Sequence, residues 1–289
     1  MELQQMRYVV AVAQERNFTR AAERCHVVQS ALSHQIKALE RELGVTLFAR
    51  SSRRVEPTAA GEAFLVAARA SLQAADRAIA DAAAASGEIR GTLTVGLIPT
   101  VTAIDVPAAL ARFHRNHPAV RISVRTGGSD EFIAAIAGGT VDVAVLGLPD
   151  EQSHRGVVMR TLARERLVAV VAADHPLAAR RRIRLADLAD ETFVDFPDRT
   201  PGRTQSDLAF ANAGIRREVA FEAMSTDLIL DLVRHGLAVA LLGPGLVSDG
   251  DDLRTIALTD GPTRVQCLAW SDFNASPAVR AFVGVLLGD

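Results

Sequence analysis

The hydrophobic pattern of the chain changes character near residue 90. Before that point, apolar residues recur every three or four positions, which is the spacing of amphipathic helices. From Gly91 onward, short segments that are apolar at nearly every position alternate with helical segments. Such alternation is typical of α/β folds in which helices cover a parallel sheet. We therefore expect a helical N-terminal part followed by a larger α/β part.

Composition limits the class of protein. The 289 residues are too many for one small module, and a hydrophobic fraction of 49% is ample for buried cores. No run of about 18 uncharged apolar residues is present, which predicts that nothing spans a membrane. The first residues carry charge and lack the apolar run of a secretory signal, so we expect a cytoplasmic protein with reduced thiols.

Neither cysteine nor histidine spacing points to a metal site or a cofactor. Cys25 and Cys267 lie far apart and form neither a metal-ligand spacing nor a disulfide framework. His114 and His117 are spaced by three on an expected helix, but no third ligand is near them. We predict no metal, no cofactor and no catalytic residue.

Charge is distributed unevenly along the chain. Residues 1–58, called the head below, carry nine basic and six acidic side chains, a net +3 in a chain of net −2. A basic head on an acidic body is typical of a module that binds a polyanion. An ordinary solvated surface is the alternative, and the residue pattern has to decide.

The head is predicted to form three helices in the order of a helix-turn-helix. A first helix has an apolar stripe from Leu3 to Ala13, and a short second helix covers 20–24 with Thr19 as its N-cap. A third helix is expected over about 30–43, ended by Gly44. Leu32, Ile36, Leu39 and Leu43 fall on one side of the third helix and polar residues on another, as in a DNA-recognition helix.

The polar side of this helix and the segment after it carry the candidate DNA contacts. Amide, hydroxyl and amino groups can read base edges or bind phosphates, and arginines of a short wing can reach the backbone or minor groove. The predicted set is Thr19, Arg20, Gln29, Ser30, Ser33, His34, Lys37, Arg50, Arg53 and Arg54. Because Val28 has no side-chain acceptor, we expect Gln29 or Ser30 to cap the recognition helix.

An alanine-rich segment over 59–87 is predicted to be one long linker helix. Its apolar stripe is Phe64, Ala68, Leu72, Ala75, Ile79 and Ala82. A single helix with no domain around it cannot bury such a stripe, so we expect the same helix of a second subunit to cover it. Packing on its own domain is the alternative.

The α/β part over 88–289 is predicted to form two lobes with a cleft between them. Two extended apolar stretches, near 163–172 and 262–270, have the pattern of chain crossing from one lobe to the other. Lobe I is expected over about 88–163 and 270–289, and lobe II over about 164–269.

Loops that follow predicted strands carry the candidate effector contacts. Hydroxyl groups at helix N-termini are good anion sites, so we predict a small, carboxylate-bearing effector in the cleft. The predicted residues are Thr100, Thr102, Ser129, Phe196, Arg199 and Thr226, with Phe196 as an apolar wall. For each of the others, helix capping alone is an equally good interpretation.

Motifs distributed along the whole chain resemble LysR-type transcriptional regulators. In the head they include Phe18-Thr19-Arg20-Ala21-Ala22-Glu23, Ala31-Leu32-Ser33 and Leu47-Phe48-Ala49-Arg50; beyond it they include His117-Pro118, Val141-Asp142, His175-Pro176-Leu177 and Gly236-Leu237-Ala238. The resemblance implies a winged helix-turn-helix, a linker-helix dimer interface and a sensor that resembles periplasmic binding proteins, assembled as a homotetramer.

The resulting hypothesis is a regulator that binds double-stranded DNA and responds to a small molecule. Ligand binding would shift the population of lobe arrangements and so alter the bound DNA. A solute-binding protein without gene control is the second interpretation, although the basic head and the missing export signal oppose it. An enzyme ranks third because no nucleophile, metal or cofactor pattern is present.

Overall fold

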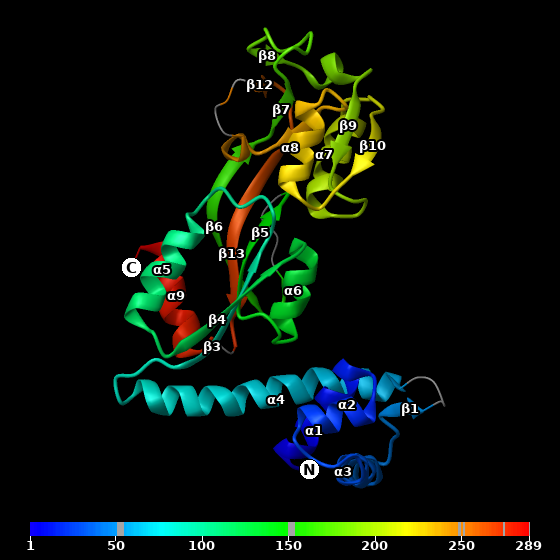
Figure 1. Cartoon of the computed structure of the whole chain (residues 1–289), viewed down its shortest axis with the longest axis vertical. Coiled ribbons are helices and arrows are strands. Elements are labelled where there is room, and N and C mark those ends of the chain that lie inside the picture. The colour runs from blue at the N-terminus through cyan, green and yellow to red at the C-terminus, as the bar shows by residue number, and fades with distance from the viewer. Residues whose placement is uncertain (51–54, 150–153, 248–249, 251, 274, 289) are drawn as a thin grey trace. The chain divides into compact units, whose positions relative to one another are not determined.

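The computed structural model describes residues 1–50, 55–149, 154–247, 250, 252–273 and 275–288. The chain divides into two compact units, Met1–Glu88 and Ile89–Asp289, which are described separately (Figure 1). Among the described residues, no helix has both the length and the apolarity needed to cross a membrane.

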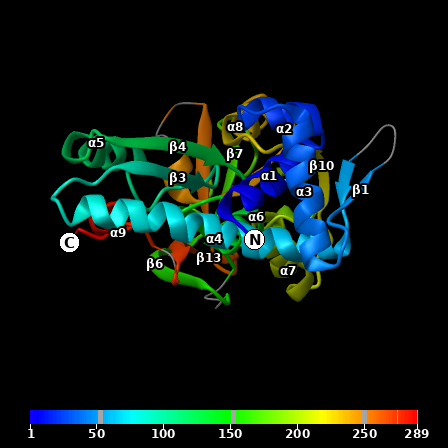
Figure 2. The same ribbon diagram turned by 90° about the horizontal axis from the view of Figure 1, so that it is seen from below.

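The N-terminal unit consists of helices and one hairpin. The helices are α1 (Leu3–Glu15), α2 (Phe18–Arg24), α3 (Gln29–Leu43) and α4 (Ala59–Ala84). The first three cluster at one end of the long α4 (Figure 2). Their shared core includes Val9, Val12, Ala21, Leu32 and Ile36, all essentially without solvent contact. The apolar stripes predicted from helical spacing therefore meet in one core.

The starts of α2 and α3 differ from the prediction. The side chain of Asn17 caps α2 by accepting hydrogen bonds from the N–H groups of Thr19 and Arg20, at 2.8 and 3.1 Å. Thr19 lies inside the helix, so its predicted role as N-cap is wrong. Val28 occupies the N-cap position of α3 without a side-chain hydrogen bond, and Gln29 and Ser30 are already helical. The expectation that one of those two caps α3 is also wrong, because the helix begins one residue earlier than predicted.

A short antiparallel hairpin follows α3, where the wing was predicted. Its strands are β1 (Phe48–Arg50) and β2 (Val55–Pro57). Arg53 and Arg54 lie outside the described residues, and only the backbone of Arg50 is described. After the hairpin, Thr58 caps α4 by accepting from the N–H of Gly61 at 3.0 Å. A Cβ at Gly61 would lie 2.1 Å from the carbonyl oxygen of Leu47, so only glycine allows this close approach.

Lobe I of the C-terminal unit is a mixed sheet in the order β4-β3-β5-β13-β6 with helices on both faces (Figure 1). Strand β3 runs parallel to β4 and β5, whereas β13 runs antiparallel to β5 and β6. The elements are β3 (Gly91–Leu97), α5 (Val106–Asn116), β4 (Val120–Thr126), α6 (Ser129–Ala137), β5 (Val143–Leu148), β6 (Val157–Arg166), β13 (Thr263–Ser271) and α9 (Pro277–Leu287).

Lobe II contains a sheet in the order β11-β7-β12-β8 and the parallel pair β10-β9. Strands β11 and β12 are both antiparallel to β7. The elements are β7 (Val168–Ala172), β8 (Arg182–Ile183), β9 (Thr192–Asp195), α7 (Pro201–Asn212), β10 (Glu218–Glu222), α8 (Thr226–Arg234), β11 (Ala240–Leu242) and β12 (Leu253–Leu258), with short 3₁₀ turns at Leu185–Leu188 and Pro244–Leu246.

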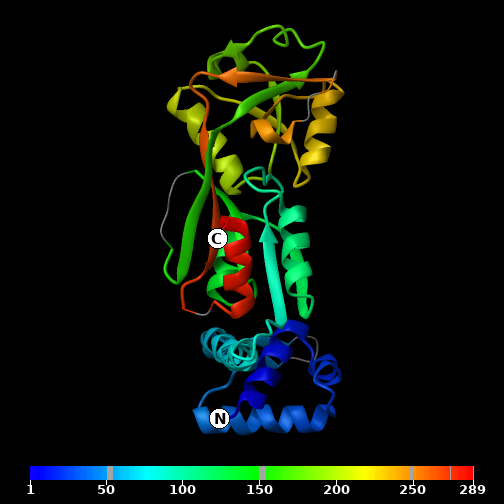
Figure 3. The same ribbon diagram turned by 90° about the vertical axis from the view of Figure 1, so that its left-hand side faces the viewer.

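Strands β6 and β13 carry the chain from lobe I to lobe II and back (Figure 3). They pair antiparallel along their length, from Val157 opposite Ser271 to Arg166 opposite Thr263. An outgoing and a returning strand must run in opposite directions. The predicted parallel pairing is right for β3, β4 and β5, whereas β13 joins β5, and β11 and β12 join β7, in antiparallel fashion.

Candidate functional site

The polar face of α3 is a surface with few internal bonds. Gln29, Ser30, His34 and Lys37 are exposed, and Ser33 is half-buried. The opposite face is closed, since Leu32, Ile36 and Leu39 have no solvent contact. The core thus holds α3 in place while its polar side chains point outward, as groove reading requires.

The short helix α2 presents the other two described candidates. Thr19 and Arg20 are exposed at its first turn. The guanidinium of Arg20 donates to the backbone carbonyl of Glu15 at 2.7 Å, and Arg24 pairs with the carboxylate of Glu15 at 3.0 Å. These exposed contacts contribute little stability, so Arg20 can exchange its partner for a phosphate at small cost.

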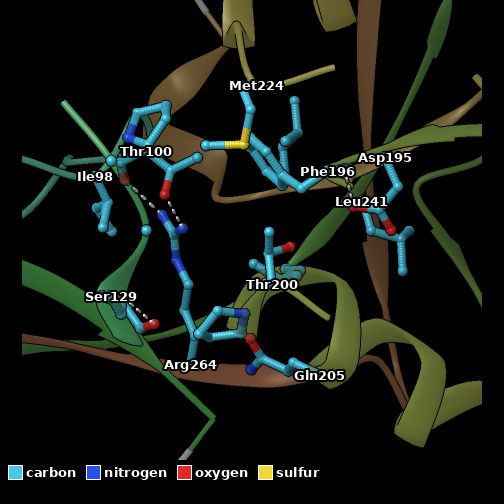
Figure 4. A pocket seen from close by; sticks show the side chains of 18 residues that line it. Ile98, Thr100, Ser129, Asp195, Phe196, Thr200, Gln205, Met224, Leu241 and Arg264 are labelled. Carbon is cyan, nitrogen blue, oxygen red and sulfur yellow. Dashed lines mark hydrogen bonds between the residues drawn. The ribbon is translucent and has the colours of Figure 1, made fainter. Parts of the chain in front are cut away.

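A cavity in the C-terminal unit lies between the lobes (Figure 4). About 620 Å³ of space lies between its lining atoms, a volume that includes space open to solvent. Its lining comes from loops after β3 and β4, from β9, α7, β11 and from the crossing strand β13. The lining residues used below are Ile98, Thr100, Gly128, Ser129, Asp195, Phe196, Thr200, Gly202, Gln205, Met224, Leu241, Leu242 and Arg264.

The structure brings three of the six predicted effector residues to this cavity. Thr100, Ser129 and Phe196 line it. Thr102 lies behind the lining, and Thr226 lines a neighbouring hollow that also includes Pro99. The side chain of Arg199 is 92% exposed and pairs with Asp198 at 3.6 Å, away from the cavity.

The arginine that does line the cavity is Arg264 on β13, which was not predicted. Its Nη1 donates to the Thr100 hydroxyl at 2.7 Å, its Nη2 to the Thr100 carbonyl at 2.9 Å, and its Nε to the Glu165 carboxylate. Burial lowers the pKa of the Arg264 guanidinium, and the Glu165 charge opposes that shift. The cation is therefore already partnered in this arrangement.

A second side chain of β13 extends this network to Thr102. Gln266, which is fully buried, donates to Glu165 at 2.6 Å and to the Thr102 hydroxyl. Its carbonyl oxygen accepts from the backbone N–H groups of Thr102 and Ala103, at 3.0 and 3.2 Å. The loop after β3 is thus held to the crossing strands by a polar network, in which Thr102 has a positioning role.

The hydroxyl of Ser129 is also used internally. It donates to the Gly147 carbonyl and accepts from the Gly147 N–H, both at 3.0 Å. Ser129 is the first residue of α6, whose N-cap Gly128 makes no side-chain capping bond. Backbone N–H groups of this helix start, rather than the hydroxyl, are the donors available at the cavity.

An acidic residue of lobe II, Asp195, faces the same cavity and is buried. Its Oδ2 lies 2.7 Å from Nη2 of Arg217, whose side chain is 3% exposed and lies over the rings of Phe193 and Phe210. Burial raises the pKa of Asp195, and the Arg217 charge opposes that shift. Arg217 also donates to Asp207 at 2.7 Å, which joins Asp195 to α7.

A hydrogen bond joins the two lobes at the hollow beside the cavity. The Thr226 hydroxyl donates to the Pro99 carbonyl at 3.1 Å. Thr226 begins α8 in lobe II, and Pro99 follows β3 in lobe I. A ligand entering the cavity would therefore meet two lobes that already touch.

Comparison with known families accounts for both units. Residues 3–62 match the bacterial regulatory helix-turn-helix family of LysR type, and residues 86–289 match the LysR substrate binding domain. The chain belongs to the LysR family of bacterial transcriptional regulators. The expectation of such a regulator, rather than an enzyme, is confirmed, as is its expected fold class: an N-terminal winged helix-turn-helix, a long linker helix and a C-terminal two-lobed α/β domain.

Individual relatives are similar along most of their length. The DNA-binding transcriptional dual regulator OxyR of Escherichia coli is 32% identical over 243 residues, 84% of this chain and 79% of that protein. The transcriptional dual regulator GltC of Bacillus subtilis is 33% identical over 242 residues, with 84% and 80% covered.

Solved structures show the same fold. A cysteine-to-aspartate variant of full-length OxyR from Pseudomonas aeruginosa superposes with a TM-score of 0.79 at 27% identity, covering 99% of this chain and 94% of that one. Full-length CbnR in complex with its target DNA gives a TM-score of 0.68 at 27% identity, covering 100% and 99%.

Sequence reasoning missed Asp195, Gln205 and Arg264. The strand that carries Arg264 contains one usable signal, since Arg264 and Gln266 alternate within an otherwise apolar strand and so share a face. Nothing comparable marks Gln205, because one glutamine in a mixed helix is typical of a solvated face. Its burial depends on segments distant in sequence.

Proposed function

We propose that this LysR-type DNA-binding regulator changes its action on DNA when a small anionic molecule occupies the cavity between lobes I and II. The supporting observation is that one cavity collects loops from both lobes and a residue of the crossing strand β13. A ligand there contacts both sides of the hinge formed by β6 and β13. Its differential affinity for open and closed lobes would shift their populations.

At the DNA, we propose that α3 enters the major groove, with Gln29, Ser30, Ser33, His34 and Lys37 as base or phosphate contacts. Thr19 and Arg20 of α2, with Arg50, Arg53 and Arg54 of the wing, would hold the phosphate backbone. The exposure of the described α3 and α2 side chains supports this assignment. Chromosomal DNA as the target places the protein in the cytoplasm in this proposal.

The proposed assembly is a homodimer through the linker helix, with dimers pairing into tetramers. Ile79, a residue of the predicted apolar stripe of α4, is 65% exposed, and a second copy of the helix would cover it. Ile79→Glu should shift the protein to monomers in light scattering, while Ala78→Glu, which introduces the same charge at a small exposed residue, tests for a general charge effect.

Peroxide sensing through a disulfide within the C-terminal unit is not part of the proposal. Several relatives are named hydrogen peroxide-inducible genes activators. In this chain Cys267 is the single cysteine after residue 88, and it is buried in β13. A disulfide within that unit needs a second thiol.

The proposal is tested with DNA from upstream of the protein's own gene and a panel of small carboxylates. Electrophoretic mobility shift should detect binding that weakens steeply with salt, and at least one acid should alter it. Gly202→Phe should abolish the response by filling the cavity beside Phe196, since a Cβ at Gly202 lies 3.5 Å from that ring. Ala211→Phe, on the exposed side of α7, should retain it. Equal responses of the two variants contradict the assigned cavity.

A further inference from the structure

Gln205 is a buried amide group whose nitrogen has no partner. It lies on α7, is 6% exposed and lines the cavity (Figure 4). Within the described part of the chain, no acceptor bonds its Nε2. Buried donors are almost always satisfied, and an unsatisfied one destabilises the fold. An acceptor that arrives from outside would satisfy this N–H₂ group.

A second set of unused donors borders the same cavity. The nine-residue helix α6 starts at Ser129, its N-cap Gly128 supplies no side-chain acceptor, and both residues line the cavity. The Ser129 hydroxyl is engaged with Gly147. Asp130 and Glu131 of the first turn are exposed and do not line this cavity. The helix start therefore favours an acceptor with negative charge.

The charges around the cavity limit how much negative charge can enter. Arg264 is balanced by Glu165, and Asp195 is balanced by Arg217. A second carboxylate on the ligand would face the buried Asp195 without a free cation among the described lining residues. Ile98, Phe196, Met224, Leu241 and Leu242 form apolar walls for the rest of the molecule.

We infer that the effector is a small monocarboxylate with an apolar body, and that Gln205 Nε2 is the donor that selects its carboxylate. The inference rests on the proposed function, because it assigns chemistry to the same cavity. Gln205 thereby determines specificity for an acceptor group. A carboxamide presents donors of its own and loses the negative charge that the α6 start favours.

Matched probes test this assignment on the full chain by thermal shift. The monocarboxylates are 4-methylpentanoate and phenylacetate, their controls are 4-methylpentanamide and phenylacetamide, and glutarate is the dicarboxylate. At millimolar concentration, at least one monocarboxylate should raise Tm by several degrees, while its amide and glutarate should not. Gln205→Glu should abolish that shift through repulsion, and Asn212→Asp, the same change at the exposed end of α7, should retain it.

A second measurement needs no ligand. Gln205→Met replaces the unpartnered amide with an apolar side chain of similar size, so Tm should rise by about 2–4 °C. A structural role for the amide would make the same change lower Tm. A fall in Tm overturns the inference.

The remaining outcomes separate this inference from the proposed function. Equal shifts by acid and amide, retention of the shift in Gln205→Glu, or no shift by any monocarboxylate overturns the monocarboxylate assignment. If another compound stabilises the protein and Gly202→Phe removes that effect, the proposed effector function stands and the monocarboxylate assignment alone is wrong. If Gly202→Phe leaves the effect of the small molecule on DNA binding unchanged, the proposed function fails.

Discussion

The recognition helix and the cavity handle polar side chains in opposite ways. On α3, the polar residues Gln29, Ser30, His34 and Lys37 are close together in sequence and exposed. In the cavity, polar residues come from segments as distant as Thr100 and Arg264, and most of them already bond one another. Water satisfies the exposed groups, whereas buried groups must find partners in the protein. The proposed DNA contacts of α3 are therefore supported by exposure, and the proposed contact of Gln205 in the cavity is supported by its missing partner.

The strongest test of this contrast breaks one ion pair in each region. Arg217→Leu removes the cation that pairs with buried Asp195, and should cost about 3–5 kcal/mol of unfolding free energy. Arg24→Leu breaks the exposed pair with Glu15 and should cost about 0–1 kcal/mol. Urea denaturation of both variants measures the difference. Similar losses would show that Arg217 is not buried as described.

The next effect concerns the core beneath the recognition surface. Ile36→Ala removes a side chain with no solvent exposure from the centre of the helical core, and should cost about 3 kcal/mol. Hydrogen exchange of the α3 amides should speed up, and DNA binding should weaken as the helix loses its support. Unchanged exchange would contradict the packing of α3 against α1 and α2.

A smaller effect is expected when only the exposed face is changed. Gln29→Ala should weaken DNA binding by about 1–3 kcal/mol, which is roughly 5- to 150-fold, with Tm unchanged. Gln4→Ala removes an exposed glutamine of α1 and serves as the control. Mobility shift at fixed salt compares the two variants. Equal affinities would remove Gln29 from the predicted contacts.

The smallest effect is a pH dependence of stability in lobe I. The Asp142 carboxylate accepts from the Thr94 N–H at 2.7 Å, but burial raises its pKa above the ordinary 3.8. The folded state therefore binds the proton more tightly than the unfolded chain, so ionisation opposes folding. This contribution is present at low pH and is lost as pH rises through the raised pKa. In urea denaturation, the unfolding free energy of the unaltered protein minus that of Asp142→Asn should be larger at pH 3 than at pH 7. A difference that does not change with pH would refute this prediction.

Local features were predicted well where neighbouring residues decide the outcome. The glycine at 44 ends α3 with φ of +70°, and the apolar stripe of α3 is the buried one. The errors at the start of α2 and α3 were shifts of one or two residues among competing polar neighbours. Asn17 has a more favourable capping side chain than the threonine two positions later.

The sequence by itself determined the succession of helices and strands and which face of α3 is buried, because periodicity and capping act between residues close in the chain. The tertiary structure decided which strands run antiparallel, which threonines bond Arg264 or Gln266, and that the Nε2 of Gln205 has no partner among the described residues. Those outcomes depend on burial and hydrogen bonding between distant segments, which adjacent residues do not encode.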